Sequence, residues 1–472
     1  MNTPINDLRQ QTRRHFFSEC GVGLGKMALA SLCVEGAFAS QGRLSGLPHH
    51  KPRAKHVIHL FMSGAPSQLE LFDYKPGLAK IEGQPLPPSL LENQRYAFIR
   101  KDAAVMSAQF RFAKHGNCGM EISDVLPHLS KVVDDITLVR SVKTDQFNHA
   151  PAQIFFNTGS GLPGRPSIGS WVTYGLGSEN KNLPGFMVFS TGAGISGGAA
   201  NWSSGFLPTP HTGVRLRNQG EAMLNLSRPA DISNAEDQAT AAALRSINAQ
   251  RQRRELDPAI DARISSYELA YRMQTEAPDV MDLSKESKET LELYGADPKV
   301  PSFARACLLA RRMIERGVRF INIYHEGWDA HSDVVGNING NAKVTDKASA
   351  ALIIDLKQRG LLDDTIVIWG GEFGRTPMVE SNKALGRSQG RDHHPAAYSM
   401  WFAGGGFKQG FTYGETDDLG FNVVKDPVHV HDIQATLLHC LGIDHKRLTY
   451  RFAGRDYRLT DVHGQVVPAL LA

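Results

Sequence analysis

The chain has few cysteines, no long apolar run and no strong excess of charge of either sign. Of its five cysteines, Cys20 and Cys33 lie near the N-terminus, and Cys118, Cys307 and Cys440 are far apart. This spacing excludes a disulfide framework and a CxxC metal site. The net charge of +4 is spread over 472 residues. Without a basic stripe, the sequence indicates no nucleic-acid partner.

The N-terminal segment has the three parts of an export signal. Arg13 and Arg14 form a twin-arginine pair, a glycine-containing apolar stretch follows, and Ala37-Phe38-Ala39 is a small-residue cleavage site. The apolar stretch is shorter than the roughly 20 residues of a membrane span, and nothing later in the chain approaches that length. We therefore expect a twin-arginine signal peptide over 1–39, export to the periplasm or beyond, and no membrane span in the mature protein. The alternative is that this segment is an amphipathic helix or a membrane anchor.

Buried strands alternate with amphipathic helices along most of the remaining chain. Apolar and β-branched runs predict strands at 56–62 and in DITLVRSV, PGFMVFS, GVRFINIY, DDTIVIW and AAYSMWF, with helical patterns such as KASAALIIDLKQRG between them. This alternation predicts an α/β fold with a mostly parallel sheet sandwiched by helices. Residues 229–299 are polar and helix-prone, which predicts a helical insertion within one domain over 40–472.

Three loops next to predicted strands are rich in carboxylates and histidines. The three loops are HEGWDAHSD, GGEFGRTP and GRDHHP. The candidate residues in them, including the arginine of GGEFGRTP, are His325, Glu326, Asp329, His331, Asp333, Glu372, Arg375, Asp392, His393 and His394. Carboxylates and imidazoles bind zinc and similar ions, and a guanidinium binds a phosphate or sulfate group. Any one loop is also compatible with solvated surface. Because sites lie beyond the carboxyl ends of parallel strands, the three loops together predict a one- or two-metal hydrolytic site.

The stretch TDQFNHAPAQIFFNTGS places Asn148 and His149 just ahead of Pro151. Proline fits the first turn of a helix, where its missing N–H has no partner to lose, so we expect a helix to begin here. Such a helix start favours an anion through its free N–H groups and its dipole. His149 is therefore a candidate metal ligand, general acid or base, or nucleophile. The alternative is a residue that caps the helix or hydrogen-bonds behind the site.

Taken together, these motifs resemble the bacterial family called domain of unknown function 1501. The motifs are the twin-arginine start, FMSGAPSQLELFDYKP, NHAPAQIFFNTGS, PSIGSWVTYGLG, CLLARRMIERGVRFINIYHEGWDAHSD, GGEFGRTP, GRDHHP and HDIQATLLHCLGIDH, and they cover nearly the whole mature chain. The segments LIIDLKQRGLLDDTIVIWGGEFG and DIQATLLHCLGI are also similar to parts of alkaline phosphatases and sulfatases. The resemblance therefore implies an alkaline phosphatase or sulfatase-like fold.

The resemblance also implies roles for single residues. The implied metal ligands are Asp329, His331, Glu372 and His394, followed by Asp392 and His393, with Glu70 and Asp73 as further oxygen donors from the loop after the first strand. Arg375 would bind the oxyanion. Aligning on Thr158 and Gly159 places Asn148 and His149 where relatives keep the nucleophile, so that position holds a histidine.

The chain departs from the superfamily pattern in three places. No Cys-x-Pro-x-Arg or Ser-x-Pro-x-Arg sulfatase signature is present. The first strand ends in Met62-Ser63-Gly64, where a metal-binding aspartate is expected, and Glu70 replaces the family's usual aspartate. Asp73 precedes Tyr74-Lys75-Pro76, so holding a turn is an alternative role for it.

These observations predict an exported metal-dependent hydrolase of a phosphate or sulfate ester, with a small molecule or a glycan ester as substrate. The expected cofactor is a divalent metal, zinc in the first place and calcium as the alternative. The main rival is a catalytically degenerate binding protein of the same fold that recognises a glycan or an envelope partner. A structural surface protein with solvated loop charges is the third possibility, and the sequence identifies no protein partner.

Overall fold

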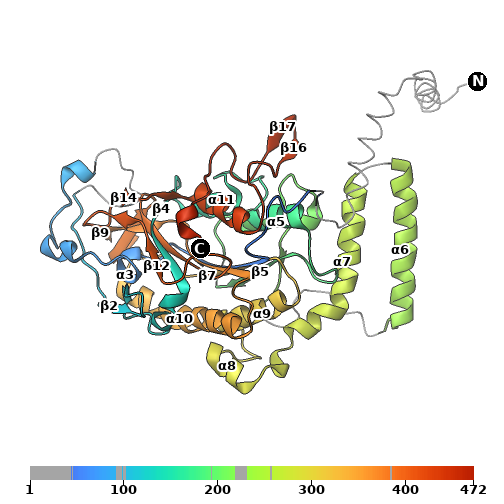
Figure 1. Cartoon of the computed structure of the whole chain (residues 1–472), viewed down its shortest axis with the longest axis horizontal. Coiled ribbons are helices and arrows are strands. Elements are labelled where there is room, and N and C mark those ends of the chain that lie inside the picture. Colours follow the sequence, from blue (N-terminus) through green and yellow to red (C-terminus); the bar gives the residue numbers. More distant parts are fainter. Residues whose placement is uncertain are drawn as a thin grey trace, which may run out of the picture.

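A nine-stranded sheet forms the centre of the molecule (Figure 1). The computed structural model describes residues 44, 46–91, 98, 102–192, 194–217, 231–255, 258–382 and 385–472, so the expected signal peptide lies outside the described residues. The strand order is β12-β4-β11-β8-β1-β7-β5-β6, and β15 also pairs with β4. The strands are β1 (His56–Ser63), β4 (Ile136–Lys143), β5 (Phe186–Thr191), β6 (Val214–Arg215), β7 (Phe320–Glu326), β8 (Thr365–Gly370), β11 (Tyr398–Ala403), β12 (Phe411–Tyr413) and β15 (Val428–His429).

Most neighbouring strands in this sheet are parallel, as the sequence predicts. The pairs β1–β7, β1–β8, β5–β7, β5–β6, β4–β12 and β4–β15 are parallel. Only β11 runs against its neighbours, pairing antiparallel with β4 and with β8. The amino end of β11 therefore lies at the edge of the sheet where β7 and β8 end.

Helices cover both faces of the sheet. One face packs against α8 (Lys288–Tyr294), α9 (Phe303–Glu315) and α10 (Val334–Gln358), and the other against α4 (His149–Thr158), α5 (Ile168–Leu176) and α11 (Val430–Cys440). Side chains of β1 alternate between the two cores, since Leu60 joins the first and Phe61 the second. Burial on both faces explains why the strands are apolar runs rather than alternating ones. In the described part of the chain, no helix has both the length and the apolar character of a membrane span.

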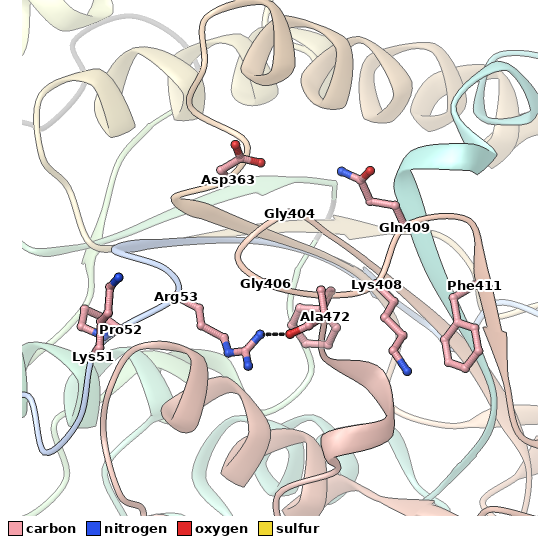
Figure 2. Close-up of a pocket in the computed structure, with 11 residues that line it drawn as sticks. Lys51, Pro52, Arg53, Asp363, Gly404, Gly406, Lys408, Gln409, Phe411 and Ala472 are labelled. Carbon is pink, nitrogen blue, oxygen red and sulfur yellow. Dashed lines mark hydrogen bonds between the residues drawn. The ribbon is translucent and has the colours of Figure 1, made fainter.

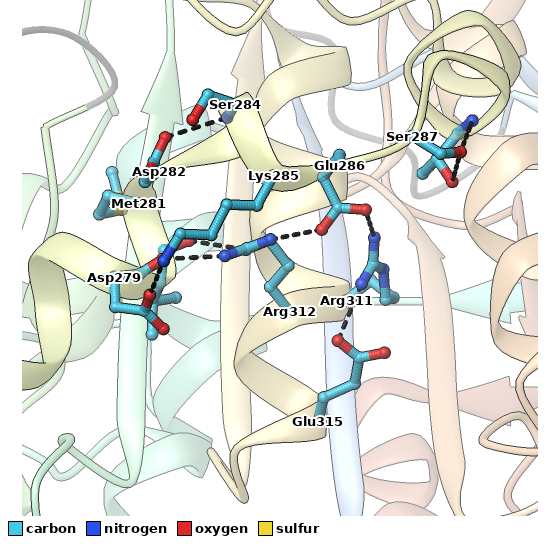
Figure 3. Close-up of polar contacts among 12 residues, drawn as sticks. Asp279, Met281, Asp282, Ser284, Lys285, Glu286, Ser287, Arg311, Arg312 and Glu315 are labelled. Carbon is cyan, nitrogen blue, oxygen red and sulfur yellow. Dashed lines mark hydrogen bonds and ion pairs between the residues drawn. The ribbon is translucent and has the colours of Figure 1, made fainter.

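The polar segment after β6 is helical and stands to one side of the sheet (Figure 1). It contains α6 (Asn234–Glu255) and α7 (Pro258–Met281), followed by the short turn Leu283–Lys285 and by α8. Figure 3 shows how its end is fastened to α9: Glu286 forms ion pairs with Arg311 and with Arg312, each at 2.5 Å. These three side chains are largely buried, so the contact lies within the protein rather than on its surface.

A two-stranded hairpin, β9 (Gly374–Asn382) and β10 (Arg387–His394), follows β8 and leads into β11. The loop after β7 runs along β10, because the N–H of Arg391 donates to the carbonyl of Ala330 (2.9 Å) and that of Asp333 to Ser388 (3.0 Å). This pairing brings the HEGWDAHSD, GGEFGRTP and GRDHHP segments to one edge of the sheet. Shorter elements complete the structure: α3 (Gln68–Leu71), β2 (Phe112–His115), β3 (Met120–Ser123), β13 (Glu415–Thr416), β14 (Val423–Lys425), β16 (Tyr450–Phe452) and β17 (Arg455–Tyr457).

Candidate metal centre

Three histidines point one ring nitrogen each at a single carboxylate oxygen, Asp329 Oδ1. The distances from this oxygen to Nε2 are 3.2 Å for His149, 3.0 Å for His331 and 3.6 Å for His393. His149 is the first residue of α4, His331 and Asp329 lie in the loop after β7, and His393 lies near the end of β10. Four potential metal ligands from three separate segments thus converge at the carboxyl edge of the sheet.

The other ring nitrogen of each histidine has its own acceptor behind the cluster. Nδ1 of His149 lies 2.6 Å from Glu372 Oε1, Nδ1 of His331 contacts Glu380 Oε2, and Nδ1 of His393 lies 2.7 Å from the carbonyl of Phe147. An Nδ1–H that donates to a carboxylate or a carbonyl leaves the lone pair of the neutral ring on Nε2. Metal-binding histidines in proteins are commonly held in this way.

The unpaired atoms of the cluster fit a bound cation. Nε2 of His149 and of His393 are buried and make no well-directed hydrogen bond, although both face Asp329. Candidate ligand atoms of His149, Asp329, His331 and His393 all lie within 4.8 Å of one another. Three imidazoles and one carboxylate are a donor set for zinc, whereas calcium takes oxygen ligands almost alone. The residues at this place therefore fit a divalent metal ion.

A second group of possible ligands, His331, Glu380 and Asp392, is already occupied by hydrogen bonds. Both oxygens of Asp392 accept main-chain N–H groups, from His393 and from Phe98, each at 2.8 Å. Glu380 accepts from His331 and, at 2.7 Å, from Arg387. The carboxylates of this second group thus already accept hydrogen bonds from the protein, and Glu380 and Asp392 contact His331 and the N–H of His393, two members of the first group.

Charge within the cluster shifts the pKa values of its members in opposite directions. Burial alone lowers the pKa of His149, but its ion pairs with Asp329 and Glu372 raise it to about 9. Burial alone raises the pKa of the Asp329 carboxyl, but the three histidines and Arg375 hold it well below its usual range. His393 differs, because burial lowers its pKa to about 3 and nearby positive charges add to this effect. The two carboxylates thus favour a proton on His149, and a metal bound at its Nε2 would compete with that proton.

Arg375 lies beside the cluster but is occupied by protein acceptors. Its guanidinium is fully buried and donates to the carbonyls of Gly64, Ala65 (3.0 Å) and Arg391 (2.9 Å), and to Asp329 Oδ1 at 2.5 Å. The contacts identify it as the residue that fixes Asp329 and the loop after β1. No contact tests the predicted role of Arg375 as the oxyanion-binding group, which stays a prediction.

Glu372 also lies behind the cluster rather than in it. Its Oε1 accepts hydrogen bonds from the N–H of Gly64 (3.0 Å), from Gln153 Nε2 (3.1 Å) and from His149 Nδ1. The carboxylate thus orients His149, and it is not among the atoms that converge within 4.8 Å. Its second oxygen, Oε2, is buried and has no hydrogen-bond partner among the described residues, so the predicted role of Glu372 as a metal ligand stays a prediction.

Three other predicted ligands lie outside the cluster. His394 Nε2 bonds to the carbonyl of Phe421 at 2.5 Å, and its ring stacks on that of Phe421. Glu70 forms a fully buried ion pair with Arg391 at 2.7 Å. Asp73 contacts Thr416 Oγ1 at 2.5 Å and Lys75 Nζ at 3.1 Å, in keeping with its alternative role in holding a turn. In each case a nearby protein partner satisfies the group that the sequence offered as a ligand.

The remaining candidates have structural contacts. Asn148 is the N-cap residue of α4, its side chain makes no capping hydrogen bond, and it is exposed. His325 has both ring nitrogens bonded, to Thr191 (3.0 Å) and Asn341 (3.1 Å). Asp333 caps α10 through the N–H of Gly336 at 3.0 Å.

Sequence reasoning did not identify Glu380 or Phe98. Glu380 stands in the run TPMVES without a histidine beside it. It reaches His331 because β9 pairs with β10 and the loop after β7 lies along β10. Phe98 packs edge-on against His331 and His393, with ring centroids 5.1 and 5.7 Å away. Neither residue carries a local signal, because both depend on contacts between distant segments.

A surface hollow of about 800 Å³ lies at the opposite edge of the sheet (Figure 2). Lys51 and Arg53 line it just before β1, and Gly404, Lys408 and Phe411 line it after β11. It therefore opens where β1 begins and β11 ends, away from the histidine cluster.

The chain belongs to the family described as "Protein of unknown function (DUF1501)", which matches residues 54–471. This confirms the family resemblance of the sequence motifs. No curated protein matches the chain.

Several solved structures have a similar fold at low identity. The sulfatase PsFucS1 from Pseudoalteromonas sp. is 12% identical, with 91% of this chain and 74% of that chain covered and a TM-score of 0.38. An alkaline phosphatase from the Antarctic bacterium TAB5 is 12% identical over 82% of this chain and 98% of its own, with a TM-score of 0.32. A phosphonate monoester hydrolase from Silicibacter pomeroyi is 12% identical, with 67% and 68% covered and a TM-score of 0.29. Because these TM-scores are low, the description of the fold rests on the strand order of this chain and not on the matched structures.

Proposed function

We propose that this member of the DUF1501 family is a metal-dependent hydrolase of a phosphate or sulfate ester, exported by the twin-arginine pathway. The observation that supports the metal is the convergence of three histidine Nε2 atoms on Asp329 Oδ1, within 3.6 Å. A divalent ion held there by His149, Asp329, His331 and His393 would supply a Lewis acid for an ester oxygen and would lower the pKa of a bound water. The ester class follows the motif resemblance to alkaline phosphatases and sulfatases.

The protein's own residues supply binding and orientation. Asp329 has 43% of its side chain exposed although it is held by Arg375, so the cluster is open to a substrate. The first turn of α4 begins at His149 without a side-chain cap, and its N–H groups favour an anionic group next to the cluster. Phe98 and Phe373 pack against the histidine rings and limit the access of water from their side.

A binding protein without turnover is the second candidate, and His149 is the observation that favours it. The motif alignment puts this residue at the nucleophile position, yet its two nitrogens face Glu372 and Asp329. Nδ1 of His149 faces Glu372, so once Nε2 binds a metal the ring has no nitrogen left with which to attack an ester. In that case the attacking group would have to be something other than His149, such as water.

The proposal is tested by metal analysis and by turnover of the same preparations. Purified protein should contain close to stoichiometric zinc, and an Asp329→Ala, His331→Ala double variant should lose it. Aryl phosphates, phosphodiesters and aryl sulfates serve as the substrate panel, and turnover should disappear together with the metal. Asp73→Asn is the matched control, because Asp73 was a predicted ligand that lies outside the cluster.

The outcomes separate the candidates. Metal bound at the cluster without turnover of any ester supports the binding protein. Wild-type protein that takes up no divalent metal contradicts the proposed metal centre and, with it, the metal-dependent hydrolase. Metal retained in the double variant would place the metal elsewhere in the chain.

A further inference from the structure

Glu380 links the candidate metal centre to a charged residue near the surface. One of its oxygens, Oε2, contacts Nδ1 of His331, and the other, Oε1, accepts from Arg387 Nη1 at 2.7 Å. The Glu380 side chain is fully buried, whereas 23% of the Arg387 side chain is exposed. Both residues belong to the β9–β10 hairpin, so the hairpin carries the whole connection.

Each half of this arrangement has a physical requirement. His331 can bind a metal through Nε2 only when its ring is held in one orientation and its proton lies on Nδ1, and an acceptor behind Nδ1 enforces both. A carboxylate buried next to the ring needs a compensating positive charge, because an unpaired buried charge is strongly unfavourable. Arg387 supplies that charge.

The acceptors behind the three histidines differ in whether they are charged and in which donors hold them. The acceptor of His393 is a main-chain carbonyl, which has no charge to compensate. The carboxylate behind His149, Glu372, is held by the neutral donors Gly64 N–H and Gln153 Nε2. The three acceptors are Glu372, Glu380 and the Phe147 carbonyl. Apart from the histidines themselves, Arg387 is the cationic side chain among the described residues that contact them. It also lies over the ring of Phe98 at 4.3 Å, and Phe98 contacts both His331 and His393.

We infer that Glu380 and Arg387 form a positioning pair for His331 and that this pair sets the affinity of the centre for its metal. The inference rests on the metal centre of the proposed function and assigns neither residue a contact with substrate. In Glu380→Gln, either His331 or Arg387 faces an amide N–H₂ instead of an oxygen, so one of the two contacts is lost.

The test is zinc affinity, measured by competition with a chromophoric chelator on the full chain. Glu380→Gln should weaken zinc binding by about 10- to 100-fold, the usual effect of losing a partner behind a metal-binding histidine. Arg387→Gln should weaken it in the same direction by a smaller factor, and Arg387→Lys should restore most of the affinity. The double variant should be no weaker than Glu380→Gln, because the two residues act through one path. The visible spectrum of the Co²⁺ form should change in Glu380→Gln as the His331 ring loses its fixed orientation.

Glu70→Gln is the matched control. Glu70 pairs with Arg391 as Glu380 pairs with Arg387, and its side chain is equally buried, but it contacts no histidine. Its zinc affinity should equal that of the wild type. Arg387 lies near the surface, so its variants keep the test decisive if Glu380→Gln does not fold.

Wild-type zinc affinity in both Glu380→Gln and Arg387→Gln overturns the positioning pair and leaves the metal centre intact. Equal losses in Arg387→Gln and Arg387→Lys also overturn it, because a retained charge should restore Glu380. Failure of the proposed function looks different: the wild type binds no zinc, or His331→Ala keeps it.

Discussion

At the scale of single residues, the hydrogen bond behind each histidine decides what the centre can bind. Glu372, Glu380 and the Phe147 carbonyl each face an Nδ1, so each Nε2 is turned toward Asp329. The same geometry turns Nε2 of His149 toward Asp329, so we propose that His149 is a ligand rather than a nucleophile. Residue types alone leave that choice open, because a histidine at a helix start is equally suited to a cap.

Replacing His149 by alanine tests its assignment as a ligand. Loss of one of four ligands should weaken zinc binding by more than the about 10- to 100-fold expected for a residue behind the shell. Chelator competition measures the change, and Asn148→Ala is the control, because that side chain is exposed and makes no capping bond. Unchanged affinity in His149→Ala would reduce this residue to the start of α4.

The sequence identified Asp329, His331 and His393 because aspartate and histidine are dense in two loops beside predicted strands. It also offered Glu70, Asp73 and His394, which the fold pairs with Arg391, Thr416 and Phe421 instead. Composition cannot separate these two sets. A carboxylate that binds a metal and one that pairs with a buried arginine are the same residue type, and only tertiary contacts distinguish them.

At the scale of elements, the direction of β11 explains why three loops meet. The GRDHHP segment precedes its strand and the other two follow theirs, so they share an edge only because β11 is antiparallel to β8. The sequence predicts the strands from their apolar runs but not their direction. The β9–β10 hairpin was also not predicted, since its strands are polar and rich in charge.

Gly390 in β10 permits the close approach of the loop after β7, which carries Asp329 and His331. A Cβ at this position would lie 2.0 Å from the carbonyl carbon of His331 and 2.6 Å from the N of Ser332. Gly390→Ala should therefore push the loop away from β10, lower zinc affinity and destabilise the fold. The control is Gly340→Ala in α10, where a Cβ meets nothing within 4 Å and alanine should stabilise the helix by up to about 1 kcal/mol. Zinc affinity unchanged in Gly390→Ala would show that the loop does not depend on this approach.

At the scale of the whole molecule, one sheet carries both the core and the candidate centre, and the helical segment from α6 to α8 is joined to it by buried charge. Glu286 lies between Arg311 and Arg312, and Arg311 also contacts Asp355 of α10 at 2.9 Å. The polar, helix-prone composition of residues 229–299 indicated helices. It gave no sign of the arginine pair in α9 that holds them.

This attachment predicts a pH-dependent contribution to stability. Burial alone raises the pKa of Glu286, but Arg312 and Arg311 lower it below its ordinary value. A carboxylate with a lowered pKa in the folded state stabilises the protein above its unfolded pKa, and this contribution is lost as the pH falls through the folded value. Glu286→Gln should therefore cost about 3 kcal/mol near neutral pH, and the difference from wild type should shrink below about pH 4.

Urea unfolding of the wild type and of Glu286→Gln, at neutral pH and below about pH 4, measures the difference in their free energy of unfolding. Glu292→Gln is the control, because its pair with Lys288 is exposed and should contribute about 0.5 kcal/mol or less. An equal loss at acidic and neutral pH would contradict the electrostatic origin of the attachment.

The most direct test of the metal centre is a crystal structure of the zinc-loaded protein, with diffraction data collected at the zinc absorption edge. We expect one anomalous peak bound by Nε2 of His149, His331 and His393 and by an oxygen of Asp329, at about 2.0–2.2 Å from each. The Nδ1 contacts to Glu372, Glu380 and the Phe147 carbonyl should be retained. An empty cluster in zinc-loaded crystals, or a peak held by Glu70, Asp73 or His394 instead, would contradict this expectation.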